Sequence, residues 1–115
     1  MTTRYISLLS KIQSGGLAIL DSGVSTELER RGQEMHDEAW SACVSIDSFD
    51  VLVSTHQAYI DAGADVITVN SYASSRLVLD PAGLSSEVRS INMKNIDAAR
   101  LARERCGDDA VLIAG

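Results

Sequence analysis

The chain has 115 residues, of which 45% are hydrophobic, and a formal net charge of −6. This size and composition suit one globular unit, and the acidic balance without a basic block argues against nucleic acid or an anionic membrane surface as a partner. No apolar run approaches the ~20 residues of a membrane-spanning helix, and residues 1–9 lack the apolar region of a signal peptide. We therefore expect a soluble, cytoplasmic protein.

The chain begins with a predicted helix and strand. Residues 3–14 predict a short amphipathic helix, because their apolar side chains recur at helical spacing. Residues 17–20 form an apolar run short enough for a buried strand, and Asp21 follows this run directly. A carboxylate at the exit of a strand can simply form a turn, but strand exits are also where α/β proteins place their sites. Asp21 is therefore the first candidate for function.

The residues after this strand lead into a second helix and a loop. Gly23 suits a tight backbone turn, and Thr26 and Glu29 have the spacing of a capping box, which predicts that the helix begins at Ser25 or Thr26. The connection that follows contains Trp40, the only tryptophan in the chain. A single tryptophan is more often a packing residue than a ligand contact, and its position in a loop leaves both roles open.

A second helix–strand unit follows. Residues 48–62 predict a helix with one apolar face, and His56 falls on or near that face, where we expect a hydrogen-bonded structural histidine. The strand predicted at residues 65–69 is β-branched over its last four residues, as in a parallel strand that is covered on both faces. Asn70 and Tyr72 follow it, so a second strand exit carries side chains that could bind a ligand.

The rest of the chain predicts helices at residues 74–79 and 85–106, the second capped by Ser85, and a strand at residues 110–114. The order is a βαβαβ unit with right-handed crossovers, so the fold class is α/β. Either a (β/α)₈ barrel or an open doubly wound sheet could continue it, but the first turn lacks a Gly-x-Gly-x-x-Gly motif, which weighs against a dinucleotide fold. The open strand edges predict either the front part of a longer protein or an assembly of copies.

Several motifs resemble the homocysteine S-methyltransferases. Residues 20–32, Leu-Asp-Ser-Gly-Val-Ser-Thr-Glu-Leu-Glu-Arg-Arg-Gly, resemble the opening motif of that family. The resemblance continues, in order and at fitting spacings, through Trp-Ser-Ala at 40–42, the pair His56 and Tyr59, Ala-Gly-Ala-Asp at 62–65, and residues 67–74. It implies that residues 1–115 are the N-terminal βαβαβ portion of a (β/α)₈ TIM barrel, ending after the third strand of a single barrel domain.

The resemblance implies an enzyme that moves a methyl group from a small donor to the thiol of homocysteine, forming methionine. In the family a zinc ion, held by three cysteine thiolates after later strands, activates the thiol by removing its proton. Neither Cys43 nor Cys106 lies where the family places these ligands, and neither belongs to a CxxC or Cys/His cluster. The expected zinc ligands therefore lie outside this chain, and the fragment alone is expected to be inactive.

The resemblance also implies substrate-binding residues, and it implies no catalytic or metal-binding residue among these 115. Asp21 matches the acid that contacts the ammonium group of the amino acid, and Gly23 matches the adjacent glycine of the turn. Trp40 and Tyr72 match aromatic residues near the methyl donor, where a cationic methyl group could lie against the ring faces. Asn70 matches a polar strand-end residue that lines the pocket.

Some alternatives stay open. The methyl donor is not identified, since relatives that use S-methylmethionine, betaine and methyltetrahydrofolate share this opening half. The chain also departs from the family pattern, with Ser22 in place of the second residue of Asp-Gly-Gly and Ser25 in place of a small residue that is often glycine. A hypothesis of a different class is a non-catalytic half-barrel module that acts by self-association or by pairing with a partner through its open strand edges.

Overall fold

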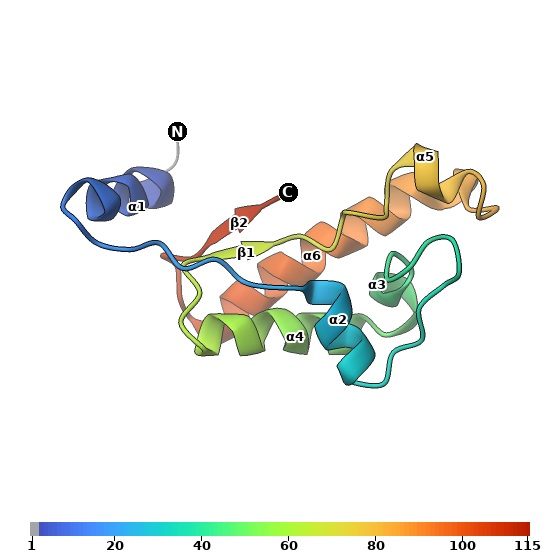
Figure 1. Cartoon of the computed structure of the whole chain (residues 1–115), viewed down its shortest axis with the longest axis horizontal. Helices are drawn as coiled ribbons and strands as arrows, with labels where there is room; N and C mark the ends of the chain where they lie inside the picture. Colours follow the sequence, from blue (N-terminus) through green and yellow to red (C-terminus); the bar gives the residue numbers. More distant parts are fainter. Residues whose placement is uncertain (1–2) are drawn as a thin grey trace.

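The structure, a computed structural model, describes residues 3–115 and has the expected α/β class. In chain order its elements are α1 (Thr3–Gln13), α2 (Val24–Arg30), α3 (Val44–Asp47), α4 (Phe49–Asp61), β1 (Val66–Thr68), α5 (Arg76–Leu79), the 3₁₀ turn η1 (Ser85–Glu87), α6 (Val88–Cys106) and β2 (Leu112–Ala114). Helices α4 and α6 pack against each other along one side of the strands, whereas α1 stands apart near the points where the strands begin (Figure 1).

The two strands pair in parallel, and β1 is central. Val66 lies opposite Leu112 and Thr68 lies opposite Ala114. On the other edge of β1, the predicted first strand at residues 17–20 contributes only one parallel bridge, from Leu20 to Val66. The expectation of a full strand there is wrong for this structure. The segment pairs with β1 alone. Leu20 is 66% exposed, so few packing contacts hold the segment in strand geometry beyond the bridge.

The core lies where α4 and α6 meet the strands. The Ile67 side chain of β1 is fully buried, as the β-branched run predicts for a strand that is covered by helices. Small side chains on α6 allow the helix to approach its neighbours closely. The buried apolar residues of this cluster include Leu28 of α2, Leu52, Val53 and Ile60 of α4, Ala98, Ala99 and Ala102 of α6, and Val111 before β2.

Two predicted helix caps are wrong. Helix α2 begins at Val24 with Gly23 as its N-cap, and it has no side-chain cap hydrogen bond because glycine has no side chain to accept one. The predicted capping box therefore does not form. Helix α6 likewise begins later than expected: the chain passes through η1 first, and the N-cap of α6 is Glu87 instead of Ser85, again without a side-chain cap bond.

Helix α1 is held mainly by charged side chains, since none of its described residues is buried. Lys11 Nζ lies 3.1 Å from Asp65 Oδ1, just before β1, and Arg4 Nη2 lies 3.4 Å from Asp109 Oδ1, just before β2. These contacts place α1 beside the starts of both strands. None of the helices formed by residues 3–115 is both long and apolar enough to cross a membrane.

Candidate functional site

Asp21 lies beside the end of β1 and is bonded to it. Its Oδ2 accepts a hydrogen bond from the Thr68 backbone N–H at 2.7 Å, and its Oδ1 accepts one from the Thr68 hydroxyl at 2.9 Å. The Asp21 backbone N–H donates to the Val66 carbonyl at 2.9 Å. The two strand exits therefore lie side by side at the same end, as the sequence predicts. A carboxylate has about four acceptor positions, so Asp21 can still accept bonds from a ligand.

A hydrogen bond from α4 stabilises the turn that follows Asp21. The hydroxyl group of Tyr59 donates to the Gly23 carbonyl at 3.3 Å. Burial raises the pKa of Tyr59, and the nearby carboxylates of Glu27 and Asp21 raise it further, so the hydroxyl keeps the proton that it donates. The exposed Gly23 is thus fixed in place next to the carboxylate.

The aromatic pair, Trp40 and Tyr72, stands at the same end of the sheet. The two ring centroids lie 5.6 Å apart and the ring planes differ by 20°, which is a stacked arrangement. The Trp40 side chain is 51% exposed and the Tyr72 side chain is 85% exposed, so neither residue belongs to the core. The pair joins two loops that are far apart in the sequence, and it leaves aromatic surface open to a ligand.

The loop that carries Trp40 is unusually constrained. Trp40 has a φ of 48°, the only left-handed value at a non-glycine residue among residues 3–115. The backbones of His36 and Trp40 exchange two hydrogen bonds of 2.9 Å, and the His36 Nδ1 atom accepts from the N–H groups of Glu38 and Ala39, both at 3.1 Å. A bulky residue in this region is strained, so the surrounding bonds must hold it there.

A group of polar side chains, buried at two of its members and half-buried at Ser25, connects the loops of the site, and we call it the serine–asparagine chain. It consists of Ser25, Ser41 and Asn70. The Ser25 and Ser41 hydroxyl oxygens lie 2.6 Å apart, and the Ser41 hydroxyl donates to Asn70 Oδ1 at 2.9 Å. The Nδ2 atom of Asn70 donates in turn to the Ser41 carbonyl at 2.9 Å. The predicted ligand residue Asn70 is thus 6% exposed, with both ends of its amide engaged by Ser41.

Sequence reasoning did not identify Ser25 and Ser41 as parts of the site. The available signal is their position, since Ser41 follows Trp40 directly and Ser25 stands two residues after Gly23. Serine is common in loops for many reasons, so position alone did not single them out. The contact between them depends on the tertiary arrangement of α2 and the Trp40 loop.

His56 corrects another expectation. Its side chain is fully buried on α4, and neither ring nitrogen has a hydrogen-bond partner among the described residues. The predicted hydrogen-bonded histidine is therefore wrong. Burial lowers the pKa of His56 to about 4, although the negative charge of Asp21 acts in the opposite direction. The imidazole is consequently neutral at pH 7.

The described residues do not fit a zinc ion. Across residues 3–115 there is no group of three or more His, Cys, Asp or Glu side chains that could hold a metal. Burial raises the pKa of the Cys43 thiol, and Asp47 and Glu87 raise it further. Burial also raises the pKa of the Cys106 thiol. Both thiols thus favour the protonated form, whereas zinc takes a thiolate ligand.

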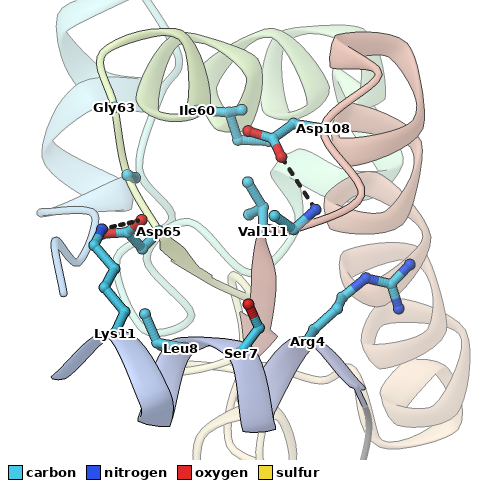
Figure 2. A pocket seen from close by; sticks show the side chains of 11 residues that line it. Arg4, Ser7, Leu8, Lys11, Ile60, Gly63, Asp65, Asp108 and Val111 are labelled. Carbon is cyan, nitrogen blue, oxygen red and sulfur yellow. Dashed lines mark hydrogen bonds and ion pairs between the residues drawn. The ribbon is translucent and has the colours of Figure 1, made fainter. Parts of the chain in front are cut away.

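A separate cavity of about 190 Å³ lies at the opposite end of the strands, between α1 and the residues that precede β1 and β2 (Figure 2). Two pairs of its polar groups bond to each other: Lys11 bonds to Asp65, and Asp108 Oδ1 accepts from the Ala110 N–H at 3.1 Å. No candidate site residue lines this cavity. The strand-exit end, with Asp21 and the aromatic pair, is the candidate site.

Comparisons with known proteins identify the family of this chain. A sequence model of the family described as homocysteine S-methyltransferase matches residues 18–115. Homocysteine S-methyltransferase 2 of Arabidopsis thaliana is 34% identical over 110 residues, which cover 87% of this chain and 33% of that protein. Selenocysteine Se-methyltransferase of Brassica oleracea var. italica is 36% identical over 102 residues, which cover 84% of this chain and 30% of that protein.

Solved structures give the same result. The oxidized form of the homocysteine methyltransferase MmuM from Escherichia coli matches with a TM-score of 0.82 and 28% identity, over 99% of this chain and 40% of that chain. Its metallated form matches with a TM-score of 0.78 over 96% of this chain. The chain spans about a third of the length of the curated relatives it matches. Because the family model covers most of the sequence and these relatives exceed 30% identity, the chain belongs to the homocysteine S-methyltransferase family.

Proposed function

We propose that this chain is the N-terminal part of a (β/α)₈ barrel enzyme that transfers a methyl group from a small donor to the thiol of homocysteine, forming methionine. The observation that carries the proposal is the bond between the Asp21 carboxylate and Thr68, because it places Asp21 at the exit of β1, the strand whose following loop carries Tyr72 of the aromatic pair. That end of the strands is where barrel enzymes bind their substrates. The comparisons favour an enzyme over the alternative of a non-catalytic module.

In this proposal Asp21 binds the ammonium group of homocysteine. Thr68 holds both carboxylate oxygens in fixed positions, so the carboxylate is oriented before the substrate arrives. An ammonium group would use the remaining acceptor positions and form a charge-assisted hydrogen bond, which is stronger than a neutral one. Gly23, exposed in the adjacent turn, allows the substrate to approach the backbone.

The aromatic pair would contact the methyl donor. A sulfonium or quaternary ammonium group that carries the transferable methyl is attracted to the negative face of an aromatic ring. Trp40 and Tyr72 are exposed and mutually stacked, so their outer surfaces are available for such a contact. This role sets no preference between the possible cationic donors.

Zinc is part of the proposal for the whole enzyme, where it would supply a homocysteine thiolate. One matched structure is described as a metallated form, which supports this part. Since residues 3–115 do not fit the ion, we assign no step of the reaction to zinc in this chain. The work of these residues is to bind and orient the two substrates.

We further propose that the remaining strands of the barrel cover the apolar side chains now exposed along the first strand segment. Leu17 is 78% exposed, Ile19 is 53% exposed and Leu20 is 66% exposed. Large apolar side chains exposed this close together in one segment normally face another part of the protein. Association with the rest of the barrel is therefore expected for the complete enzyme.

The test is homocysteine binding by the full-length protein, measured by calorimetry. Asp21→Ala removes a charge-assisted bond and should weaken binding about 10- to 100-fold. Asp97→Ala is the matched control, because Asp97 is an exposed carboxylate on α6. Equal affinities of the two variants would refute the role of Asp21. Asp21→Asn, which retains an acceptor oxygen, provides a second measurement if the alanine variant folds poorly.

A further inference from the structure

The serine–asparagine chain has a fixed direction. Because the single Ser41 hydroxyl proton is donated to Asn70 Oδ1, the Ser41 oxygen can only accept from Ser25. The Ser25 hydroxyl is therefore the donor in the 2.6 Å contact. The hydroxyl of Ser25 in α2 donates to Ser41 in the Trp40 loop, and the hydroxyl of Ser41 donates to Asn70 in the loop after β1.

The chain connects the segments that carry the candidate site residues. Ser41 is adjacent to Trp40, and Asn70 is two residues before Tyr72. The Asn70 amide engages the side chain and the main-chain carbonyl of Ser41 at once, so it fixes the backbone of the Trp40 loop relative to β1. Asn70 is 6% exposed and Ser41 is 2% exposed, and buried hydrogen bonds of this kind hold one arrangement over others.

We propose that the serine–asparagine chain positions the aromatic pair. It anchors the residue next to a tryptophan that stands at a φ of 48°, a conformation that an unsupported loop would leave. It also fixes the strand exit from which the tyrosine loop departs. Its three members are positioning residues: they set the separation and tilt of the two rings, and the rings make the contact with a ligand. The inference rests on the proposed function only for the identity of that ligand.

The test uses the optical signals of Trp40, isolated by subtracting the spectra of the corresponding Trp40→Phe protein. Ser41→Ala and Ser25→Ala should weaken the near-ultraviolet circular dichroism of the stacked pair and raise the quenching of Trp40 fluorescence by acrylamide about twofold. Ser41→Thr, which restores the hydroxyl group, should recover much of the signal. A purely structural role would change the melting temperature and leave these signals unchanged.

Ser45→Ala is the matched control. Ser45 is fully buried and lies four residues after Ser41, but its hydroxyl bonds only to the nearby Ala42 carbonyl at 3.3 Å. Ser45→Ala should lower the melting temperature about as much as Ser41→Ala does, while leaving the Trp40 signals as in the unmodified protein. The proposal is overturned if Ser45→Ala changes the signals as much as Ser41→Ala does. If Ser41→Ala fails to fold, Ser25→Ala decides alone, and an unchanged spectrum refutes the proposal.

A binding measurement separates this inference from the proposed function. Trimethylsulfonium serves as the probe for the full-length protein, and Ser25→Ala should weaken its binding several-fold. If trimethylsulfonium does not bind the unmodified protein, the donor role of the aromatic pair is refuted, and the optical measurements still judge the positioning. If it binds all variants equally, the positioning is refuted and the donor role stands.

Discussion

The Asp21 carboxylate accepts two hydrogen bonds from one residue, Thr68, through the backbone N–H and the side-chain hydroxyl. This contact joins the first strand segment to β1 just beyond their backbone bridge between Leu20 and Val66. The residue that is proposed to bind substrate is therefore also a structural tie between two strands. Both roles use the carboxylate oxygens as hydrogen-bond acceptors.

The tie predicts a measurable loss of stability. Thr68→Val keeps the shape of the side chain and removes one of the two bonds, so the free energy of unfolding should fall by about 1 kcal/mol. Asp21→Asn replaces two charge-assisted bonds with neutral ones and should cost about 1–2 kcal/mol. Denaturant titration measures both. Asp97→Asn, on the exposed side of α6, should stay within about 0.5 kcal/mol of the unmodified protein, and a similar loss in all three variants would contradict the prediction.

His56 predicts a dependence of stability on pH. Its folded-state pKa is about 4 and its ordinary pKa is 6.5, so the unfolded chain binds the proton more readily between these values. The free energy of unfolding should be unaffected by this group above pH 6.5 and should fall as the pH drops from 6.5 to 4, by about 3 kcal/mol in total. His56→Leu should remove this slope.

His36→Gln is the control for that measurement, because His36 is the other histidine of the chain and is exposed. The slope between pH 6.5 and 4 should persist in this variant. Glu27 acts in a lower range: hydrogen bonds from Arg30 and then Arg31 lower its pKa from 4.5 to about 2, so its contribution is lost as the pH falls from 4.5 to about 2. A His56→Leu protein with the full slope would show that another group is responsible.

The attachment of α1 should depend on salt. The ion pairs Lys11–Asp65 and Arg4–Asp109 join it to the strand starts, and at 1 M salt the screening length falls to about 3 Å. Hydrogen exchange of the α1 amides should therefore be about 1.5- to 5-fold faster in 1 M than in 0.05 M sodium chloride. Lys11→Gln should reproduce part of the effect at low salt. Arg30→Gln, which changes the same charge on α2, should leave α1 exchange as it was.

Replacing Gly107, at the end of α6, should lower the free energy of unfolding. This glycine has a φ of 64°, and an added Cβ would meet no heavy atom within 4 Å, so any penalty comes from backbone conformation and not from crowding. Gly107→Ala should lower the free energy of unfolding by about 1 kcal/mol. Gly107→Asn should cost less, because asparagine adopts left-handed geometry more readily. Thermal unfolding compares the two, and equal losses would contradict this explanation.

The sequence predicted the longer helices well, because their apolar periodicity reflects the core directly. Helix α4 falls within the predicted range, and α6 ends at Cys106 as expected, although it starts three residues late. The extent of the first strand was overestimated, because an apolar run does not reveal how many neighbouring strands will pair with it. The cap assignments failed for a related reason: capping spacing occurs by chance, and the tertiary turn at Gly23 determines where α2 begins.

The candidate site was predicted in part. The proximity of Asp21 to the exit of β1 followed from parallel strand order, which needs only the pattern of elements. The two unpartnered nitrogens of His56 and the contact of Ser25 with Ser41 could not be predicted, because each depends on how side chains from separate helices and loops meet. Substrate contacts by the five candidate residues stay a prediction until binding is measured.

The left-handed backbone of Trp40 has a consequence for how this position changes in evolution or in a mutant library. Selection for thermal tolerance alone would favour glycine or asparagine at position 40, since both adopt this geometry with less strain. Selection for the proposed contact with a methyl donor would instead retain a large ring there. Deep sequencing of one library under both selections would therefore reveal whether an aromatic ring at position 40 is required for ligand contact.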